Sequence, residues 1–239
     1  MTETENDFVW IKTRDGFPTL WNQNLGESYR SLKGAFIESW HVFVEPALKH
    51  QINSTLARTA VGEFGLGAGT NWVLWNLSQK FLNLKVVPYF CVENDLKSFH
   101  LGRQKWIDLE KEINIFMRTK LIQEKFLNSE FPQKNFSIAD FPDPNVSSSL
   151  AEFYKNNSKV DLWFHDPFGF DVNPEGYSEE TLVQCKQLLN TQARAFSYAC
   201  NSKFQKSLKS AGFDFELLPS DPQGKLKRER IEFFAAKGS

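Results

Sequence analysis

Short apolar segments alternate with longer amphipathic segments over residues 59–196, and this alternation limits the fold more than any other feature of the sequence. The apolar segments have the length of strands, and they cover residues 59–64, 85–93, 135–139, 160–166 and 193–198. The other segments have the 3.6-residue spacing of helices, over residues 70–81, 96–126, 147–156, 179–189 and 201–211. Strands that alternate with helices predict an α/β domain with a mainly parallel sheet and helices on both faces.

The two ends of the chain depart from this alternation. Near the N-terminus, an Asp-Gly pair between two apolar runs predicts a hairpin, and the apolar spacing that follows predicts one or two helices, which Pro46 should break or kink. At the other end, residues 213–218 and 230–235 predict an antiparallel C-terminal hairpin. We therefore expect an N-terminal hairpin and helical extension over residues 1–58 and one core domain over residues 59–239.

The composition excludes several classes of protein. Of the 239 residues, 41% are hydrophobic, which is enough for a sizeable core and excludes a disordered chain. No apolar run reaches the ~18 residues of a membrane span, and the acidic start lacks the order of a secretion signal. Cys91, Cys185 and Cys200 are scattered in apolar surroundings, as expected for reduced thiols of a cytoplasmic protein. The formal charge of −1 means that any binding of nucleic acid would need a local basic patch.

A glycine-rich loop joins the first core strand to its helix. Gly65, Gly67 and Gly69 allow a tight turn and let backbone N–H groups approach a ligand. A dinucleotide-binding loop would have its third glycine at Thr70, whereas here an acid, Glu63, precedes the first glycine. The pattern E-x-G-x-G-x-G is typical of S-adenosylmethionine-dependent methyltransferases. Their cofactor has a positive sulfonium and no pyrophosphate, so an acid near the loop is compatible with it.

Acidic residues also follow the next two predicted strands. Glu93 ends the second strand, where a carboxylate can accept hydrogen bonds from both ribose hydroxyls. Asp140 follows the third strand, where it could accept a hydrogen bond from the adenine amino group while Phe141 packs on the ring. The alternative for both acids is a helix N-cap.

Four stretches of the chain resemble the methyltransferase domain of the MnmC family of tRNA-modifying enzymes. They are GESYRSLKGAFIES, EFGLGAGTNW, DPFGFDVNPEGY and AGFDFELLPSDPQGKLKRE, and the resemblance extends over residues 15–234. It implies a Rossmann-like methyltransferase fold, S-adenosylmethionine as methyl donor and S-adenosylhomocysteine as product. It also implies tRNA as the partner, with the primary amine of a 5-aminomethyluridine at the wobble position as methyl acceptor.

The resemblance assigns roles to individual residues. Those implied to line the methionine end of the cofactor are Glu63, Gly65, Gly67, Gly69 and Asn71. Asp166 would face the reacting amine, Phe168 would cover the nucleobase, and Tyr177 belongs to the same substrate-binding stretch. Lys227 and Arg228 match the K-R-E of the family and would contact tRNA phosphates, unless this stretch is only the solvated face of the terminal hairpin.

Asp166 stands between a buried strand and a ring-constrained proline. An alkylammonium has a pKa of ~10 and no free lone pair, so an enzyme must bind it, remove a proton and orient the nitrogen. A carboxylate fixed at a strand end can do all three. The alternative for Asp166 is a cap or turn former. His165 is either a proton relay or a strand-end histidine that points away.

Some features depart from the family pattern. Many members also contain a flavin-dependent oxidase domain, for which this chain is too short, so we expect a methyltransferase without it. Pro167, Phe170 and Tyr177 replace the usual residues of the substrate stretch, and Tyr29 and Arg30 replace those of the N-terminal block. The acceptor therefore stays open between tRNA and a small amine or protein, and a non-catalytic cofactor-binding protein is a third possibility. We expect no metal, and a monomer is compatible with the sequence.

Overall fold

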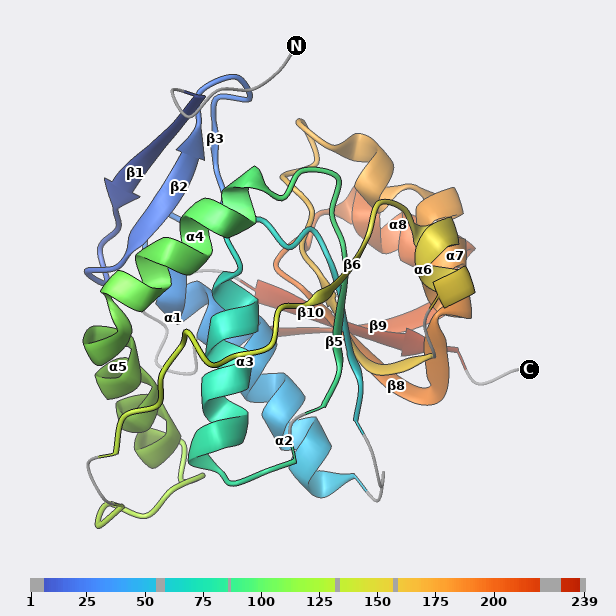
Figure 1. Cartoon of the computed structure of the whole chain (residues 1–239). Coiled ribbons are helices and arrows are strands. Elements are labelled where there is room, and N and C mark those ends of the chain that lie inside the picture. The colour runs from blue at the N-terminus through green and yellow to red at the C-terminus, as the bar shows by residue number, and fades with distance from the viewer. Residues whose placement is uncertain are drawn as a thin grey trace.

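A computed structural model describes residues 7–54, 59–85, 87–131, 134–156, 159–219 and 229–236. Within these ranges, a seven-stranded sheet lies between two layers of helices, and a separate three-stranded sheet lies near the N-terminus (Figure 1). The strand order of the large sheet is β6-β5-β4-β7-β8-β10-β9. This arrangement confirms the predicted Rossmann-like α/β fold with helices on both faces.

Pairing within the large sheet follows the predicted division between parallel core and terminal hairpin. Its strands are β4 (Val61–Phe64), β5 (Tyr89–Val92), β6 (Asn145–Ser147), β7 (Val160–His165), β8 (Leu189–Ser197), β9 (Phe213–Pro219) and β10 (Glu229–Ala235). The neighbours from β6 to β8 pair in parallel, whereas β10 pairs antiparallel with both β8 and β9. Every residue of β7 is buried, because helices cover both faces of the sheet at this central strand.

The helices of the core domain divide between the two faces of the sheet (Figure 1). One face carries α3 (Thr70–Phe81), α4 (Lys97–Asp108) and α5 (Glu110–Gln123), and the other carries α6 (Leu150–Asn156), α7 (Glu179–Gln187) and α8 (Ser202–Ser210). The start of α8 has a clear local cause, because the Asn201 side chain accepts a hydrogen bond from the Phe204 N–H.

The single helix predicted over residues 96–126 is two helices, α4 and α5, which meet at Leu109. Each is attached to a different part of the chain. Trp106 of α4 donates a hydrogen bond from Nε1 to the Ala68 carbonyl in the glycine loop at 2.7 Å, whereas Glu110 of α5 accepts one from the Ile138 N–H. The change of direction at Leu109 lets both attachments form.

The predicted strand over residues 135–139 was wrong, because β6 lies later, at Asn145–Ser147. Side chains of α5 satisfy the backbone that a strand would have paired. Asn114 accepts from the Phe136 N–H and donates to its carbonyl, at 2.8 and 3.0 Å. Since these backbone groups have partners already, the segment crosses the helical layer as a loop and reaches the sheet edge only afterwards.

The N-terminal extension forms its own small sheet and then a continuous helical segment. Its elements are β1 (Phe8–Lys12), β2 (Pro18–Asn22), β3 (Glu27–Ser28), α1 (Ala35–Ser39), a π-helical turn (Trp40–Val44) and α2 (Glu45–Asn53). The predicted interruption by Pro46 is a change of helix type, since Pro46 lies in the first turn of α2 directly after the π-helical turn. A proline has no N–H to donate, so the regular α-helical bonding cannot run through it.

The extension packs into the same hydrophobic core as the helices of the main domain. The rings of Phe17 and Phe36 stack at 4.1 Å, and Phe36 contacts Trp106 of α4 and Phe116 of α5 edge-on. This packing holds the segment after β2 against the core domain on the glycine-loop side. Among the described residues, no helix has the length and apolar character that crossing a membrane requires.

Candidate functional site

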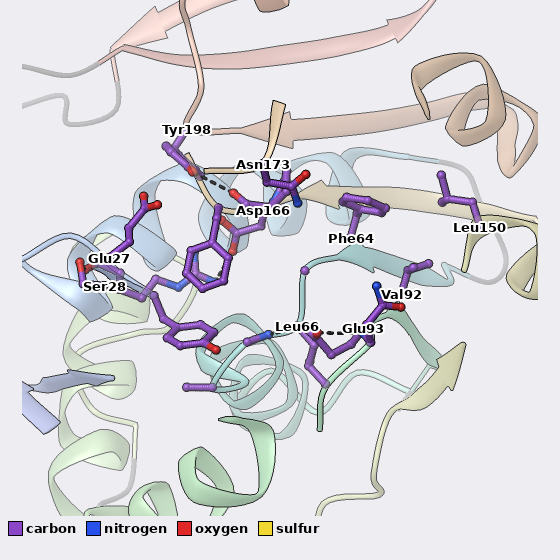
Figure 2. Close-up of a pocket in the computed structure, with 18 of the residues that line it drawn as sticks. Glu27, Ser28, Phe64, Leu66, Val92, Glu93, Leu150, Asp166, Asn173 and Tyr198 are labelled. Carbon is purple, nitrogen blue, oxygen red and sulfur yellow. Dashed lines mark hydrogen bonds and ion pairs between the residues drawn. The ribbon is translucent and has the colours of Figure 1, made fainter. Parts of the chain in front are cut away.

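A cavity of about 450 Å³ lies at the carboxyl ends of β4, β5 and β7. Its walls come from the glycine loop after β4, the ends of β5 and β7, the start of α6 and residues 27–31 of the extension. Figure 2 shows Leu66 and Glu93 toward one end and Glu27 and Ser28 toward the other. We call the first the glycine-loop end and the second the extension end. In parallel sheets, ligands bind at this edge.

The glycine loop presents backbone to the cavity without side chains in the way. Gly65 has a φ of +89°, and a Cβ on it would lie 2.5 Å from the carbonyl oxygen of Asp166. A Cβ on Gly67 would lie 2.6 Å from the Tyr29 ring. Gly69 is left-handed and directly precedes α3. The close approaches at Gly65 and Gly67 fit a cradle for a ligand such as S-adenosylmethionine.

Glu93 reaches from the end of β5 to this loop. One carboxylate oxygen accepts a hydrogen bond from the Gly67 N–H at 3.1 Å, and the other accepts from the N–H groups of Asn94 and Asp95. Burial raises the pKa of Glu93, although these hydrogen bonds oppose the rise. The carboxylate lines the cavity in a fixed orientation, as binding of a ribose would require.

The strand expected before Asp140 and Phe141 does not exist, and their predicted contacts with adenine stay a prediction. Asp140 is exposed, and Phe141 is buried edge-on against Trp72 of α3. Neither residue lines the cavity, and residues 148–150, which follow β6, occupy that part of the wall.

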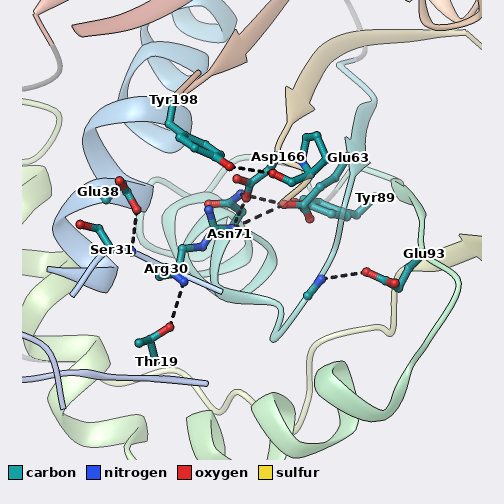
Figure 3. A network of polar contacts seen from close by, with 12 residues as sticks. Thr19, Arg30, Ser31, Glu38, Glu63, Asn71, Tyr89, Glu93, Asp166 and Tyr198 are labelled. Carbon is teal, nitrogen blue, oxygen red and sulfur yellow. Dashed lines mark hydrogen bonds and ion pairs between the residues drawn. The ribbon is translucent and has the colours of Figure 1, made fainter. Parts of the chain in front are cut away.

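Five side chains meet in a buried network between the cavity and the sheet (Figure 3). Arg30 forms an ion pair with Oδ2 of Asp166 and lies 4.0 Å from Glu63. Asn71 donates from one nitrogen to the same oxygen of Asp166 at 2.9 Å and to Glu63 at 2.7 Å. Tyr89 donates to the other oxygen of Glu63 at 2.7 Å. Asn71 thus joins Glu63 to Asp166, and neither Glu63 nor Asn71 is among the residues that line the cavity. Their contact with the methionine end of the cofactor stays a prediction.

Burial dominates the protonation of this network. It raises the pKa of Asp166 to about 7, against the opposing charge of Arg30. It raises the pKa of Glu63 to about 8, with a contribution from the charge of Asp166. Burial alone would lower the pKa of the Arg30 guanidinium. The negative charges of Asp166 and Glu63 outweigh this effect, so the pKa is raised. Near neutral pH, both carboxyl groups therefore lie close to their pKa values, unlike ordinary carboxylates, which are fully ionised there.

The loop after Asp166 is held by two tyrosines. Tyr177 and Tyr198 both donate hydrogen bonds to the Pro167 carbonyl, at 3.1 and 2.8 Å. Tyr198 lines the cavity, whereas Tyr177 is fully buried and its hydroxyl orients the loop. Its contact with substrate stays a prediction. Phe168 does line the cavity, where its ring lies 4.7 Å from that of Tyr29.

His165 faces away from the cavity. Its ring lies between Phe64 and Phe204, stacked on both at 5.5 Å, and it is fully buried. Burial lowers the pKa of His165 to about 4. Of the two interpretations of this residue, the structure supports the strand-end histidine that points away.

The extension contributes site residues that the sequence analysis did not assign. Glu27, Arg30 and Glu38 line the cavity, and Glu38 accepts a hydrogen bond from the Ser31 N–H at 2.9 Å. A signal for all three was present, since Glu27, Arg30 and Glu38 belong to the N-terminal stretch that carried the family resemblance. Nothing in one sequence indicated that this stretch would reach the carboxyl edge of the sheet.

One predicted pair of tRNA contacts cannot be placed. Lys227 and Arg228 lie outside the described residues. Within the described part of the chain, no group of three or more His, Cys, Asp or Glu side chains is arranged to hold a metal ion.

Comparisons with known proteins found relatives by sequence and by structure. A family model described as S-adenosyl-L-methionine-dependent methyltransferase matches residues 145–232. The curated protein from Campylobacter hominis named tRNA 5-methylaminomethyl-2-thiouridine biosynthesis bifunctional protein MnmC is 28% identical over 81% of this chain and 28% of its own length. The protein of the same name from Campylobacter jejuni subsp. jejuni is 23% identical over 90% of this chain and 35% of its own length.

A solved structure shares the fold. The crystal structure of MNMC2 from Aquifex aeolicus superposes with a TM-score of 0.68 at 21% identity, covering 97% of this chain and 73% of that one. The chain spans only about a third of the curated relatives that it matches. It is an S-adenosyl-L-methionine-dependent methyltransferase with a Rossmann-like fold, and it is similar to MnmC proteins.

Proposed function

We propose that this methyltransferase transfers a methyl group to the nitrogen of an aminomethyl group on a wobble uridine of tRNA. The observation that carries the proposal is the ion pair between Asp166 and Arg30 at the cavity wall. A carboxylate that binds a guanidinium nitrogen there is also suited to an ammonium nitrogen of the acceptor. The MnmC relatives, which are named for 5-methylaminomethyl-2-thiouridine biosynthesis, support the same acceptor.

Asp166 would act as the proton acceptor. The acceptor amine is bound as a cation with a pKa of ~10, and its nitrogen cannot react until a proton leaves. The pKa of Asp166 is raised to about 7, which is nearer to the pKa of the amine than that of an ordinary aspartate. Asn71 and Arg30 both bind Oδ2 of Asp166. The other carboxylate oxygen would therefore take the proton.

The glycine-loop end would hold S-adenosylmethionine. When bound, this cofactor supplies an electrophilic methyl group that the lone pair of an amine can take. Gly65 and Gly67 would allow the ligand to approach the backbone, and Glu93 would accept hydrogen bonds from its ribose. Phe168 would cover the uracil ring beside the acceptor. Lys227 and Arg228 stay our predicted contacts to tRNA phosphates.

One observation favours a second candidate. The formal charge of −1 offers no overall attraction to a polyanion, so an amine on a small molecule or a protein is the alternative acceptor.

The test uses methyl-labelled S-adenosylmethionine, purified protein and tRNA from cells that lack the gene, followed by mass analysis of the nucleosides. The proposal expects labelled 5-methylaminomethyluridine with the wild type and none with Asp166→Ala. Cofactor binding without any labelled nucleoside would contradict the tRNA acceptor. Label on a small amine or a protein, when an extract of the same cells replaces the tRNA, would then support the second candidate.

A further inference from the structure

Glu27 lies at the extension end of the cavity, and only one of its two carboxylate oxygens has a hydrogen-bond partner among the described residues. It lies in β3, and its Oε1 accepts a hydrogen bond from the Gly169 N–H at 3.2 Å. Its Oε2 is buried and has no hydrogen-bond partner among the described residues. Gly169 belongs to the loop that starts at Asp166, so Glu27 connects the extension to the loop of the proposed proton acceptor.

The surroundings of Glu27 leave its charge uncompensated. Burial raises its pKa, the Gly169 N–H opposes the rise, and the charge of Asp171 adds to it. Within the described ranges, no cation forms an ion pair with Glu27, and the ion pairs of Arg30 go to Asp166 and Glu63. A carboxylate oxygen without a donor in a protein wall is destabilising. A ligand that brings a positively charged N–H would remove that destabilisation.

Glu27 and Asp166 face a common part of the cavity. Both line it together with Tyr198, whose hydroxyl donates to the Pro167 carbonyl next to Asp166, and Figure 2 shows all three toward the extension end. Phe168, which would cover the base, directly precedes Gly169, whose N–H binds Glu27. By contrast, Leu66 and Glu93 lie toward the other end (Figure 2).

We propose that Glu27 is an acceptor-binding residue, whose Oε2 accepts an N–H of the cationic amine that is to be methylated. This inference rests on the proposed function, since it names the group that recognises the positive charge of the acceptor. The α-ammonium of S-adenosylmethionine offers the same chemistry from a second source. The position of Glu27, bound to the Gly169 N–H of the Asp166 loop and away from Glu93, favours the acceptor.

The test separates these sources with Glu27→Gln. A glutamine keeps a carbonyl oxygen for the Gly169 N–H and removes the charge, so the fold is retained. The probe is 5-aminomethyluridine, with the uncharged 5-hydroxymethyluridine as its analogue, each titrated calorimetrically in the presence of S-adenosylhomocysteine. The affinity for S-adenosylmethionine is measured separately. Glu175→Gln is the matched control, since Glu175 is exposed, belongs to the stretch that contains Asp166 and Gly169, and does not line the cavity.

The expected result is that wild type and Glu175→Gln prefer the amine over the alcohol by roughly tenfold or more, the effect of one charge-assisted hydrogen bond. Glu27→Gln should lose that preference and keep its affinity for the alcohol and for S-adenosylmethionine. The inference is overturned if Glu27→Gln keeps the preference, if the wild type has none, or if the loss falls on S-adenosylmethionine instead. Loss of the preference together with unlabelled tRNA in the methylation assay would refute the proposed function and leave this inference standing.

Discussion

Arg30 of the N-terminal extension binds the carboxylate of Asp166 at the end of β7, and Asn71 of α3 donates to the same oxygen. Both side chains of the ion pair are almost fully buried, at 6% and 4% exposed. The extension therefore does more than cover the core. It supplies the positive charge that opposes the rise in the pKa of Asp166 caused by burial (Figure 3).

Replacing Arg30 by methionine should move the pH dependence of methyl transfer. Asp166 accepts a proton only when ionised, so the wild-type rate should rise with pH through about 7. Without the positive charge of Arg30, burial of Asp166 is less opposed and its pKa rises further, so the rate should begin to rise at a higher pH. The measurement is the pH profile of the single-turnover rate.

Two variants serve as controls for that profile. Arg30→Lys keeps a positive charge and should shift the profile less than Arg30→Met. Arg14→Met removes an exposed arginine of the same extension and should leave the profile unchanged. Breaking a buried ion pair destabilises a protein by about 3–5 kcal/mol, so thermal unfolding is followed for each variant. An unshifted profile in a folded Arg30→Met protein would show that Arg30 does not govern Asp166.

Gly65→Ala should reduce activity through the position of Asp166. The added Cβ would lie 2.5 Å from the Asp166 carbonyl oxygen, so the loop or the end of β7 has to move. A displacement of about 1 Å in an active site lowers rates on the order of 100-fold. Gly16→Ala is a matched control, because Gly16 has a similar φ of +92° and nothing within 4 Å of the added atom. Equal effects of the two substitutions on methyl transfer would contradict this account.

Glu93→Gln and Asp140→Asn test which acid belongs to the cofactor site. Glu93 lines the cavity and is fixed by three backbone N–H groups, whereas Asp140 is exposed outside it. Loss of a charge-assisted hydrogen bond to the ribose should weaken binding of S-adenosylmethionine roughly tenfold or more in Glu93→Gln. Asp140→Asn should bind it like the wild type. Calorimetric titration checks both, and the reverse result would restore the role that the sequence predicted for Asp140.

Glu63 should make the protein less stable as the pH rises. Its pKa is raised to about 8, so between about pH 4.5 and 8 the folded state keeps a proton that the unfolded state has lost. The free energy of unfolding then falls with increasing pH, by up to about 1.4 kcal/mol per pH unit. Urea unfolding at several pH values should show a smaller slope in Glu63→Gln. Equal slopes in both proteins would mean that Glu63 is ionised throughout this range.

Local patterns predicted the parts of the fold whose partners lie nearby in the chain. The helix over residues 70–81 has the bounds of α3, and the aspartate after the buried strand β7 does reach the cavity. In both cases the deciding information is the apolar periodicity and the glycine or proline beside it.

The failures have a common physical cause, which is competition from side chains distant in sequence. Residues 135–139 have the apolar pattern of a strand, but Asn114 and Glu110 of α5 bind their backbone first. Arg30 reaches Asp166 only because aromatic packing of Phe36 on α4 and α5 sets the position of the extension. Neither contact has a signature within a single stretch of sequence.

The most direct test of the central claim is the single-turnover rate of methyl transfer to an anticodon stem–loop that carries 5-aminomethyluridine. It is compared between the wild type and Asp166→Asn, with saturating S-adenosylmethionine. Asparagine keeps the size of the side chain and an oxygen for the Asn71 amide, but it cannot take the proton. We predict transfer by the wild type and a loss on the order of 100-fold or more in Asp166→Asn, with unchanged cofactor affinity. Transfer by Asp166→Asn at close to the wild-type rate would contradict the account.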